Sequence, residues 1–539
     1  MKKSILALGA AVALGGLGVA GSAHAVAFFG TGTPDTHSAL PGSNLLSLNP
    51  GATGHMLFTP YFTAQGNMGT LFNITNTDLV RGKAVKVRFR GAANSDDVLD
   101  FTVFLSPGDV WTGSVAKDAA TGRAAISTSD KSCTIPDASA FPGVFKTDRL
   151  ASYLAADVKN ANTNEGYIEV LNMADIPPFL NMVKGAGGSV VNPLFTNIKH
   201  KGGVAPCDNL AFQTVLNTTL LAAGTDAEAV GLFEPTGGLM GSWAVFNQSQ
   251  LAVYSGNQTA VVASNGWSLD SALTPLTARG RIAFAPQQGA PIGGVLPGGT
   301  VDSVTADPLL RGGAPVIQPL WFDLPDMSTP LTIVAAGPVT EADQLSKSLW
   351  RSAVYNDYVA TAAGAAVPMS TDWVVSQPTR RYHAAVNYGA SASASSLVWN
   401  ADMANNATPT TTTAPATTTL NMYAPLTLNK TLAMGPQACI MLNFSSAGRE
   451  EQFQTAGGGF SPGVSLPNCG EVFTVTFGAT SVLQGAITNT VVSPVSSEGW
   501  ARLALGAGRL PIVGYAATSI KNTASNGNYG LTLPHRWVD

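Results

Sequence analysis

Paired acidic residues are the side chains in this sequence that could most directly carry out a reaction. Two carboxyl groups roughly 5–10 Å apart can hydrolyse a glycosidic bond. Four pairs lie close enough in the sequence to be candidates: Asp96/Asp97, Asp226/Glu228, Asp323/Asp326 and Glu450/Glu451. Closeness in the sequence does not set a distance in space, and acids in polar turns are usually solvated. A secreted hydrolase is therefore the least favoured of three functional hypotheses.

Two of these acidic segments also offer ligands for calcium. Ca²⁺ binds several oxygen atoms from carboxylates, amides and carbonyls, often on loops. Asn94-Ser95-Asp96-Asp97 and Asp323-Leu324-Pro325-Asp326 provide such groups without the spacing of an EF-hand. The calcium candidates are Asp96, Asp97, Asp323 and Asp326, and no other cofactor is expected.

The remaining catalytic motifs are absent from the sequence. The five histidines after residue 25 form neither a His-x-His pair nor H-E-x-x-H; they are His37, His55, His200, His383 and His535. No G-x-S-x-G is present, and the Gly-rich run at 235–241 lacks the lysine of a phosphate-binding loop. The sequence therefore predicts no enzyme.

The first 25 residues have the features of a secretory signal peptide. Lys2 and Lys3 precede an uncharged, mostly apolar run from Ile5 to Ala20, and Ala23-His24-Ala25 resembles a cleavage site. The run is shorter than the roughly 20 residues of a membrane span. We expect export across the inner membrane to the cell surface or the extracellular space, with the periplasm as an alternative. No later apolar stretch reaches that length, so the mature chain is expected not to span a membrane.

An exported protein with an even number of cysteines is expected to pair them in disulfides. The four are Cys133, Cys207, Cys439 and Cys469, and three connectivities are possible. We favour Cys133–Cys207 and Cys439–Cys469, because each pair lies within one half of the chain. A loop of about 30 residues closed by the second bond would contribute roughly 3–4 kcal/mol on the entropic model. Without C-x₂-C spacing, zinc is not indicated.

The composition is poor in charge. Charged residues make up 12% of the chain, and the formal net charge of −4 becomes −6 without Lys2 and Lys3. The usual charged fraction is about 25%, and nucleic-acid binding needs clustered basic residues. The one basic stretch is 81–90, where Lys86, Arg88 and Arg90 alternate with apolar residues. This pattern predicts a strand with a solvated polar face and excludes nucleic acid as a partner.

The elements that must position these residues are strands. Short apolar or alternating segments are separated by Gly, Pro, Asn and Asp at intervals of about ten residues, which is typical of a sandwich. Examples are 55–75, 85–89, 101–105, 166–171, 372–375 and 472–477. We expect an all-β, mainly antiparallel, sandwich-like fold with a few short helices. The strongest expected helix is near 340–360, where Thr340 suits an N-cap.

Two β-rich domains are predicted. The Pro- and Gly-rich stretch 286–315 has little periodicity and is typical of a linker or covering loop. It would separate a domain at 26–285 from one at 316–539. The Thr/Pro/Ala tract at 406–419 is expected to be an exposed loop.

Several short strings together resemble a group of poorly characterised proteobacterial exported proteins, described as cell-surface or surface-layer-like. The strings are GYIEVLNM at 166–173, GGLMGSWAVFN at 237–247, WFDLPDMS at 321–328, TDWVVSQPTRRYH at 371–383, and the closing LPIVGYAA and NYGLTLPHRW. The resemblance implies an exported all-β surface protein of a Gram-negative bacterium. It implies no active site.

The leading hypothesis is a self-assembling structural subunit of surface-layer type. Neighbouring copies, or other cell-envelope components, would cover its low-charge flanks and sheet edges. The second hypothesis is an adhesin or glycan-binding protein, and a cluster of exposed Trp or Tyr on one sheet face would favour it.

Overall fold

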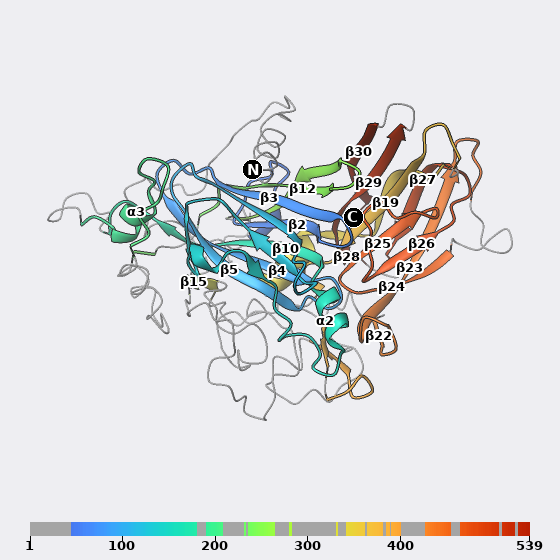
Figure 1. Cartoon of the computed structure of the whole chain (residues 1–539), viewed down its shortest axis with the longest axis horizontal. Coiled ribbons are helices and arrows are strands. Elements are labelled where there is room, and N and C mark those ends of the chain that lie inside the picture. Colours follow the sequence, from blue (N-terminus) through green and yellow to red (C-terminus); the bar gives the residue numbers. More distant parts are fainter. Residues whose placement is uncertain are drawn as a thin grey trace, which may run out of the picture.

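The protein is built mainly of antiparallel β-sheets with few short helices, which confirms the expected fold class. This computed structural model describes residues 45–180, 190–208, 231–232, 236–264, 280–282, 330–332, 341–361, 364–380, 384–388, 390–399, 426–453, 464–505, 509–522 and 527–538. Strands from the first half form one pair of large sheets, blue to green in Figure 1, and strands from the second half form another, yellow to red.

Sheet A and sheet B form the first sandwich. Sheet A has the order β1 (Leu45–Leu48), β14 (Thr259–Ser264), β2 (Met56–Thr63), β10 (Glu165–Ile176), β4 (Gly82–Gly91), β5 (Asp97–Leu105) and β8 (Cys133–Ile135). Sheet B has the order β13 (Ala252–Asn257), β12 (Ser242–Asn247), β3 (Met68–Asn76), β6 (Val110–Lys117), β7 (Ala124–Ser127) and β9 (Gly143–Val144), and β11 (Leu239–Met240) also pairs with β3.

Aromatic side chains join these two sheets. Phe72 of β3 meets Phe89 of β4 edge to face, with ring centroids 5.8 Å apart. Phe101 of β5 lies 5.4 Å from Trp111 of β6 by the same measure. Each such pair adds about 0.5–1.5 kcal/mol beyond the area that it buries. The alternation of apolar residues in these strands therefore places one face of each sheet in a common core.

Sheet C and sheet D form the second sandwich. Sheet C has the order β22 (Thr427–Asn429), β23 (Gln437–Gly448), β27 (Glu498–Ala504), β18 (Ala353–Val359) and β31 (Arg536–Val538), with β24 (Val464–Cys469) also paired to β23. Sheet D has the order β26 (Asn489–Val492), β25 (Val472–Phe477), β19 (Met369–Ser376), β29 (Val513–Asn522) and β30 (Gly527–Pro534). Phe477 joins the two sheets, stacking on Tyr358 at 4.8 Å and meeting Phe444 at 5.7 Å.

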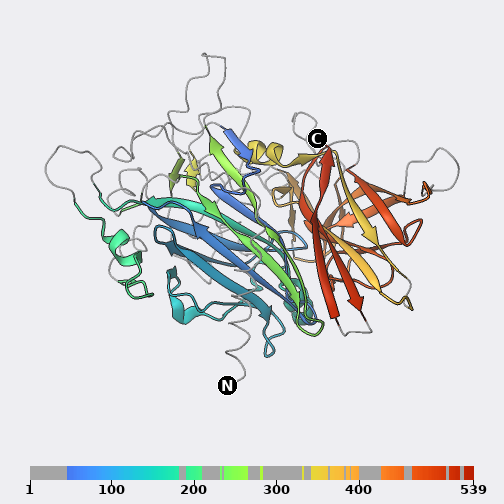
Figure 2. The same ribbon diagram turned by 90° about the horizontal axis from the view of Figure 1, so that it is seen from above.

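Sheet D is covered on its other face by the first sandwich. Tyr515 of β29 packs against Trp243 of β12 with ring centroids 4.4 Å apart. Val374, Val472 and Ala517 are buried in the same hydrophobic cluster as the core of the first sandwich. The two sandwiches thus share part of one hydrophobic core, with the strands of both halves running side by side in Figure 2.

The remaining elements are short. Small two-stranded sheets pair β15 (Gly280–Ile282) with β16 (Pro330–Thr332), β17 (Trp350–Arg351) with β28 (Leu510–Pro511), and β20 (Ala384–Asn387) with β21 (Ser396–Trp399). The helices in the described part of the chain are η2 (Ala138–Ala140), α2 (Ala156–Asn162), α3 (Pro193–Ile198) and α6 (Glu341–Ser348). In Figure 1, α3 lies at the outer end of the first sandwich, whereas α2 lies near β22, and its Asn162 donates a hydrogen bond to the Met434 carbonyl.

The helix expected near 340–360 is shorter than predicted. It ends at Ser348, and Ala353–Val359 forms β18 in the middle of sheet C. Its buried residues Val354 and Tyr358 alternate with the outward-facing Tyr355 and Asp357. Residues 353–359 form a strand because they pair with β27 on one edge and β31 on the other. Tertiary packing here overrides local propensity.

Both predicted disulfides are present. Cys133 bonds Cys207, and Cys439 bonds Cys469 across the paired strands β23 and β24. Two disulfides indicate an oxidising, extracytoplasmic environment. Among the described residues, no helix has the length and hydropathy needed to cross a membrane. The signal peptide, the 286–315 linker and the Thr/Pro/Ala tract lie outside the described residues, so those predictions stay predictions.

Candidate functional site

Buried acidic residues, rather than the acids of exposed turns, form the most unusual chemical feature of this protein. Glu165, Asp372 and Glu471 are each at most 2% exposed. All three lie where the two sandwiches meet. Ionised carboxylates in such places need several hydrogen bonds or a cation, so their partners define what the region can do.

Glu165 begins β10 and holds a loop of the second sandwich. Its Oε1 accepts hydrogen bonds from the backbone N–H groups of Ala486, at 2.7 Å, and Ile487, at 3.3 Å. Its Oε2 accepts one from the hydroxyl of Tyr61 at 3.2 Å. Burial raises the pKa of Glu165 to about 7, although these hydrogen bonds oppose the shift.

Asp372 of β19 holds the same loop from the other side. Its Oδ2 accepts from the N–H groups of Val482, at 2.8 Å, and Leu483, at 2.9 Å, and from the Ser481 hydroxyl at 2.7 Å. Burial raises the pKa of Asp372 to about 6. Two carboxyl groups, one from each half of the chain, therefore fix the connection between β25 and β26.

This connection, residues 478–488, is called the anchor loop below. Its side chains Val482, Leu483 and Ile487 are buried in the core shared with the first sandwich. The loop has no regular ladder to satisfy its N–H groups, and the two buried acids supply the acceptors instead. Unpaired backbone groups at this depth would each cost about 1–3 kcal/mol.

A second polar cluster joins the turn between β4 and β5 to the second sandwich. The Tyr388 hydroxyl donates to Asp96 Oδ2 at 2.5 Å, and Asn94 Nδ2 donates to the Pro436 carbonyl at 2.8 Å. Burial raises the pKa of Asp96 to about 7 against the lowering effect of the Tyr388 hydrogen bond. This turn is therefore a fixed contact between the two halves.

Ser95 lies at the centre of this turn with a left-handed backbone, φ +59°. Its hydroxyl is hydrogen-bonded to the Tyr167 hydroxyl at 2.8 Å and to the Glu471 carboxylate. Glu471 also pairs with Arg380, Nε to Oε1 at 3.3 Å. A serine beside a carboxylate suggests a nucleophile, but Ser95 is fully buried, so substrate has no access to its hydroxyl.

The basic residues of β4 are buried, which corrects the prediction of a solvated face. Lys86, Arg88 and Arg90 are at most 1% exposed. Lys86 pairs with Asp100 at 2.7 Å, Arg88 with Asp97 at 3.7 Å, and Arg90 with Glu169 of β10 at 3.5 Å. The neighbouring strands of sheet A supply these acids, and each acid lies diagonally across from its basic partner in the strand register. The predicted strand is present, but the burial of its basic side chains is decided by residues distant in the sequence.

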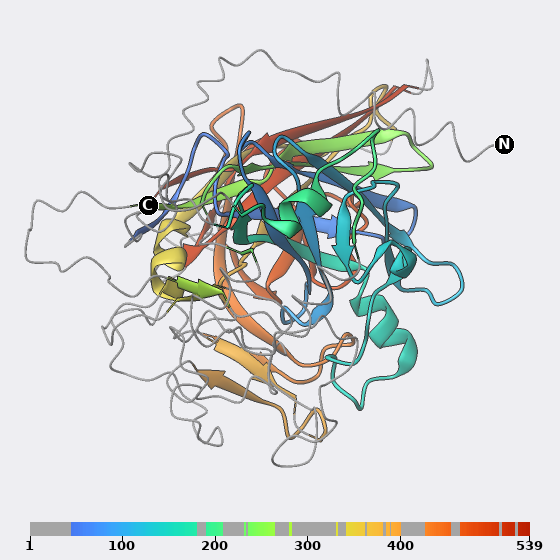
Figure 3. The ribbon, with the colours of Figure 1, turned by 90° about the vertical axis from the view of Figure 1, so that its left-hand side faces the viewer.

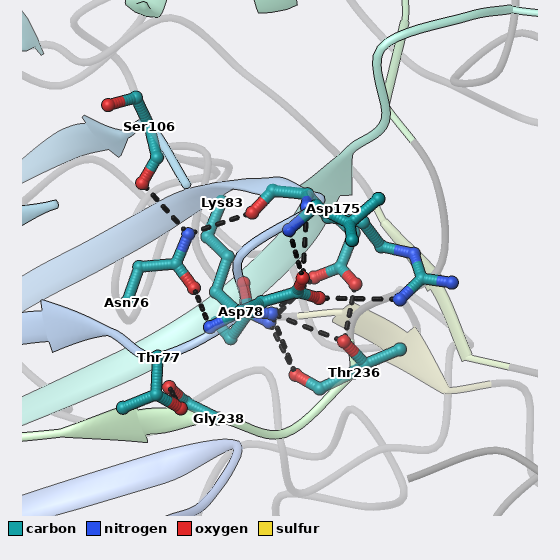
Figure 4. A network of polar contacts seen from close by, with 11 residues as sticks. Asn76, Thr77, Asp78, Lys83, Ser106, Asp175, Thr236 and Gly238 are labelled. Carbon is teal, nitrogen blue, oxygen red and sulfur yellow. Dashed lines mark hydrogen bonds and ion pairs between the residues drawn. The ribbon is translucent and has the colours of Figure 1, made fainter. Parts of the chain in front are cut away.

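A third buried network closes one end of sheet A (Figure 4). The Lys83 ammonium lies 2.9 Å from Asp175 Oδ1 and 3.2 Å from the Thr236 hydroxyl. Thr236 donates in turn to Asp175 Oδ2, and Asn172 donates to the Thr236 carbonyl. Each charge in this network has its partners in place, which is typical of a structural ion pair.

Beside it, Asn76 ties the β3–β4 turn to the end of β5. Its Nδ2 donates to the carbonyls of Arg81, at 2.8 Å, and Ser106, at 3.0 Å, and its Oδ1 accepts from the Asp78 N–H. The Thr77 hydroxyl donates to the Gly238 carbonyl at 2.8 Å. These contacts order the turn rather than present groups to a ligand.

The calcium candidates are not brought together where the structure describes them. Asp96 is hydrogen-bonded to Tyr388, whereas Asp97 lies on the face of sheet A beside Arg88 and Arg90. Asp323 and Asp326 lie outside the described residues. Within the described part of the chain, no group of three or more His, Cys, Asp or Glu side chains has a metal-binding arrangement.

The described acids of the candidate hydrolase pairs do not form a common site either. Asp96 and Asp97 point into different networks, and Glu450 and Glu451 lie on an exposed turn after β23. Asp226 and Glu228 lie outside the described residues.

His535 is buried, with Nε2 2.9 Å from the Val374 carbonyl and Nδ1 3.1 Å from Asn356 Nδ2. Burial lowers its pKa to about 4, so this histidine is a neutral core residue.

Glu165, Asp372, Glu471 and Arg380 were missed as a group by the sequence reasoning. Asp372 stands directly before the apolar run Trp373–Val375, and Glu471 directly before Val472–Phe477. An acid at the start of a fully buried strand was the available signal.

Comparisons with known proteins add no identity to this geometry: no family model, no curated protein and no solved structure matches the chain. The function must therefore be inferred from the surfaces that the fold presents.

Proposed function

We propose that this chain is an exported structural protein of the cell surface, and that its copies assemble through the outer face of sheet B. The observation that carries the proposal is the composition of that face. The side chains that point outward from β3, β6, β7, β12 and β13 are all uncharged: Leu71, Asn73, Thr75, Val110, Thr112, Ser114, Ala116, Ala125, Ser127, Ser242, Ala244, Phe246, Val253, Ser255 and Asn257.

We call these residues the neutral face. Cross-strand register places them on one side, with Leu71 opposite Ser114 and Ala244, and Phe246 opposite Val253. The alternate residues, such as Phe72, Trp111 and Val245, belong to the buried core. Val253 is 44% and Val110 45% exposed. A solvated antiparallel sheet face normally carries charged side chains, so a face without them suits contact with another protein surface.

Ionisable side chains are also buried in other parts of the protein, away from the neutral face. Among the described residues, twelve side chains of the Lys, Arg, Asp and Glu types are buried: Lys83, Lys86, Arg88, Arg90, Asp96, Glu165, Glu169, Asp175, Arg351, Asp372, Arg380 and Glu471. In a chain with only 12% charged residues, this leaves few charges to keep molecules apart in solution. The two disulfides and the resemblance to surface-layer-like exported proteins support the same proposal.

Lysines placed in the neutral face test the proposal. The variant Thr112→Lys/Val253→Lys would bring unpaired charges into a contact between copies, which is costly to desolvate. We expect the wild-type mature protein to form ordered assemblies by negative-stain microscopy and sedimentation, and the variant to remain in small species.

The matched control is Ala120→Lys/Ala138→Lys, which adds the same charge at an exposed turn and at the exposed first residue of η2. It should assemble as the wild type does. Circular dichroism establishes that both variants fold. A wild type that is strictly monomeric at all calcium and protein concentrations, or a Thr112→Lys/Val253→Lys variant that assembles normally, would overturn the proposal.

A further inference from the structure

The outer face of sheet C, on the second sandwich, has a different chemistry from the neutral face. Tyr355 of β18 and Trp500 of β27 lie next to each other there, with ring centroids 6.3 Å apart and planes inclined at 36°. Trp500 is 43% exposed although it is a large aromatic residue on a regular strand. Strand alternation keeps both rings outside the core, because their neighbours Val354 and Ala501 point inward.

Charged groups of both signs surround these rings. The Arg502 guanidinium lies over the Tyr355 ring, 5.8 Å from its centroid. Arg536 of β31 pairs with Asp357 at 3.6 Å, and the two side chains are 67% and 52% exposed. Tyr355 is the cross-strand partner of both Arg502 and Arg536, and Asp357 is that of Trp500. We call these five residues the aromatic platform.

The platform is rigidly supported from below. Trp373 of sheet D donates its indole N–H to the Asp357 carbonyl at 3.3 Å. Tyr358 stacks on Phe477 directly beneath β18. Three strands in fixed register therefore hold the two rings and the ion pair at set positions, and little ordering remains to be done when a ligand arrives.

We propose that the aromatic platform is a carbohydrate-binding site. The electron-rich face of an indole or phenol ring attracts the polarised C–H groups on one face of a sugar ring. Hydroxyl groups at the sugar's edge can accept from guanidinium N–H groups and donate to a carboxylate. Trp500 and Tyr355 supply the first kind of contact, and Arg502, Arg536 and Asp357 supply the second.

Four of the five charged side chains around the rings form two ion pairs, which favours a neutral glycan over a strongly charged ligand; the fifth is Arg502, which lies over Tyr355. Arg536 and Asp357 already neutralise one another, and the nearby pair of Arg449 and Glu498, at 3.0 Å, does the same. A strongly charged ligand would have to break these pairs, whereas a polyhydroxylated one can bridge them. A second copy of the chain is less suited, because its approach would bury four exposed ionised groups. The site lies on a different sandwich from the neutral face and does not depend on assembly.

Affinity electrophoresis of the full mature protein tests the site. The gels contain one of three soluble neutral polysaccharides: glycogen, galactomannan or hydroxyethyl cellulose. We expect at least one to retard the wild type and to quench its tryptophan fluorescence. Trp500→Ala and Tyr355→Ala should each raise the dissociation constant about tenfold or more, whereas Trp500→Phe should retain part of the binding.

Trp537→Ala is the matched control. Trp537 is 48% exposed, but it pairs with Val354 and so lies on the opposite side of sheet C from Tyr355. It contacts Arg351 instead. Its removal should leave retardation unchanged. Absence of retardation by all three polysaccharides, or equal loss in Trp537→Ala, would overturn the proposal. A change in sedimentation of Trp500→Ala without any polysaccharide effect would assign the platform to self-association instead.

Discussion

Burial shifts the protonation of Glu165 and Asp372 toward the neutral acid, because it raises the pKa of both carboxyl groups. Both side chains are buried. Each carboxyl group accepts hydrogen bonds from backbone N–H and hydroxyl groups. Asp96 is in a similar position beside Tyr388. Because burial raises the pKa of all three carboxyl groups, the folded protein retains protons that the unfolded chain would release.

We therefore expect the free energy of unfolding to fall as pH rises. Glu165 would stabilise the fold fully below its unfolded pKa near 4.5 and lose this contribution as pH passes about 7. The Asp96 and Asp372 contributions run in the same direction, up to about 7 and 6. His535, whose pKa is lowered to about 4, opposes them as pH falls below 6.5. Urea unfolding between pH 4.5 and 7.5 measures the net slope.

Glu165→Gln isolates one of these groups. Glutamine keeps an oxygen to accept the Ala486 N–H but does not titrate, so the variant should lose less stability than the wild type between pH 4.5 and 7.5. The difference should be on the order of 1–3 kcal/mol. Glu450→Gln, on an exposed turn, is the matched control. An equal pH slope in Glu165→Gln and wild type would contradict this account.

At the scale of elements, the anchor loop is the part that connects the two sandwiches most directly. Leu483 is fully buried in the core of the first sandwich although the loop belongs to the second. Leu483→Ala should lower the free energy of unfolding by about 2–5 kcal/mol through lost burial and a cavity. Met441→Ala, at a half-exposed position on sheet C, should change it by less than about 1 kcal/mol. Chemical denaturation compares the two, and similar losses would argue against the anchor role.

The local pattern of apolar and polar residues predicted where strands form better than it predicted which of their side chains are buried. The alternation at 81–90 identified β4, and the turns at intervals of about ten residues identified a sandwich. The same pattern could not show that Lys86 and Arg88 are buried, because the covering contacts come from distant segments. At 353–359, apolar spacing compatible with a helix hid the alternation of Val354, Asn356 and Tyr358, which sheet pairing then selected.

The candidate site was predicted less well than the fold. Cysteine pairing could be anticipated because export and an even count limit the choices. The buried acids could not, because an acid such as Glu165 at the start of a strand resembles any surface acid until its partners, here residues 486–487, are known. The aromatic platform likewise depends on register between β18 and β27, which no local sequence feature specifies.

At the scale of the whole molecule, the shared core predicts that both sandwiches unfold together. Tyr515 and Trp243 come from different halves and contact each other directly. Unfolding of either half would therefore expose buried apolar side chains of the other half to water. We expect one transition in thermal unfolding, with coincident curves from near-UV and far-UV circular dichroism. Two resolved transitions would show that the halves are independent.

The boundary between sheets B and D has a consequence for growth beyond a single molecule. The Ser255 N–H on the edge strand β13 donates to the side chain of Thr532 on β30, and a Cβ atom at Gly530 would lie 2.1 Å from the Val253 carbonyl oxygen. In Figure 3 the green and dark red strands run alongside each other at this boundary. β30 thus blocks the addition of another strand at β13, which is the step that leads to fibres. At this edge, association between copies is limited to contacts between sheet faces, which build layers rather than fibres.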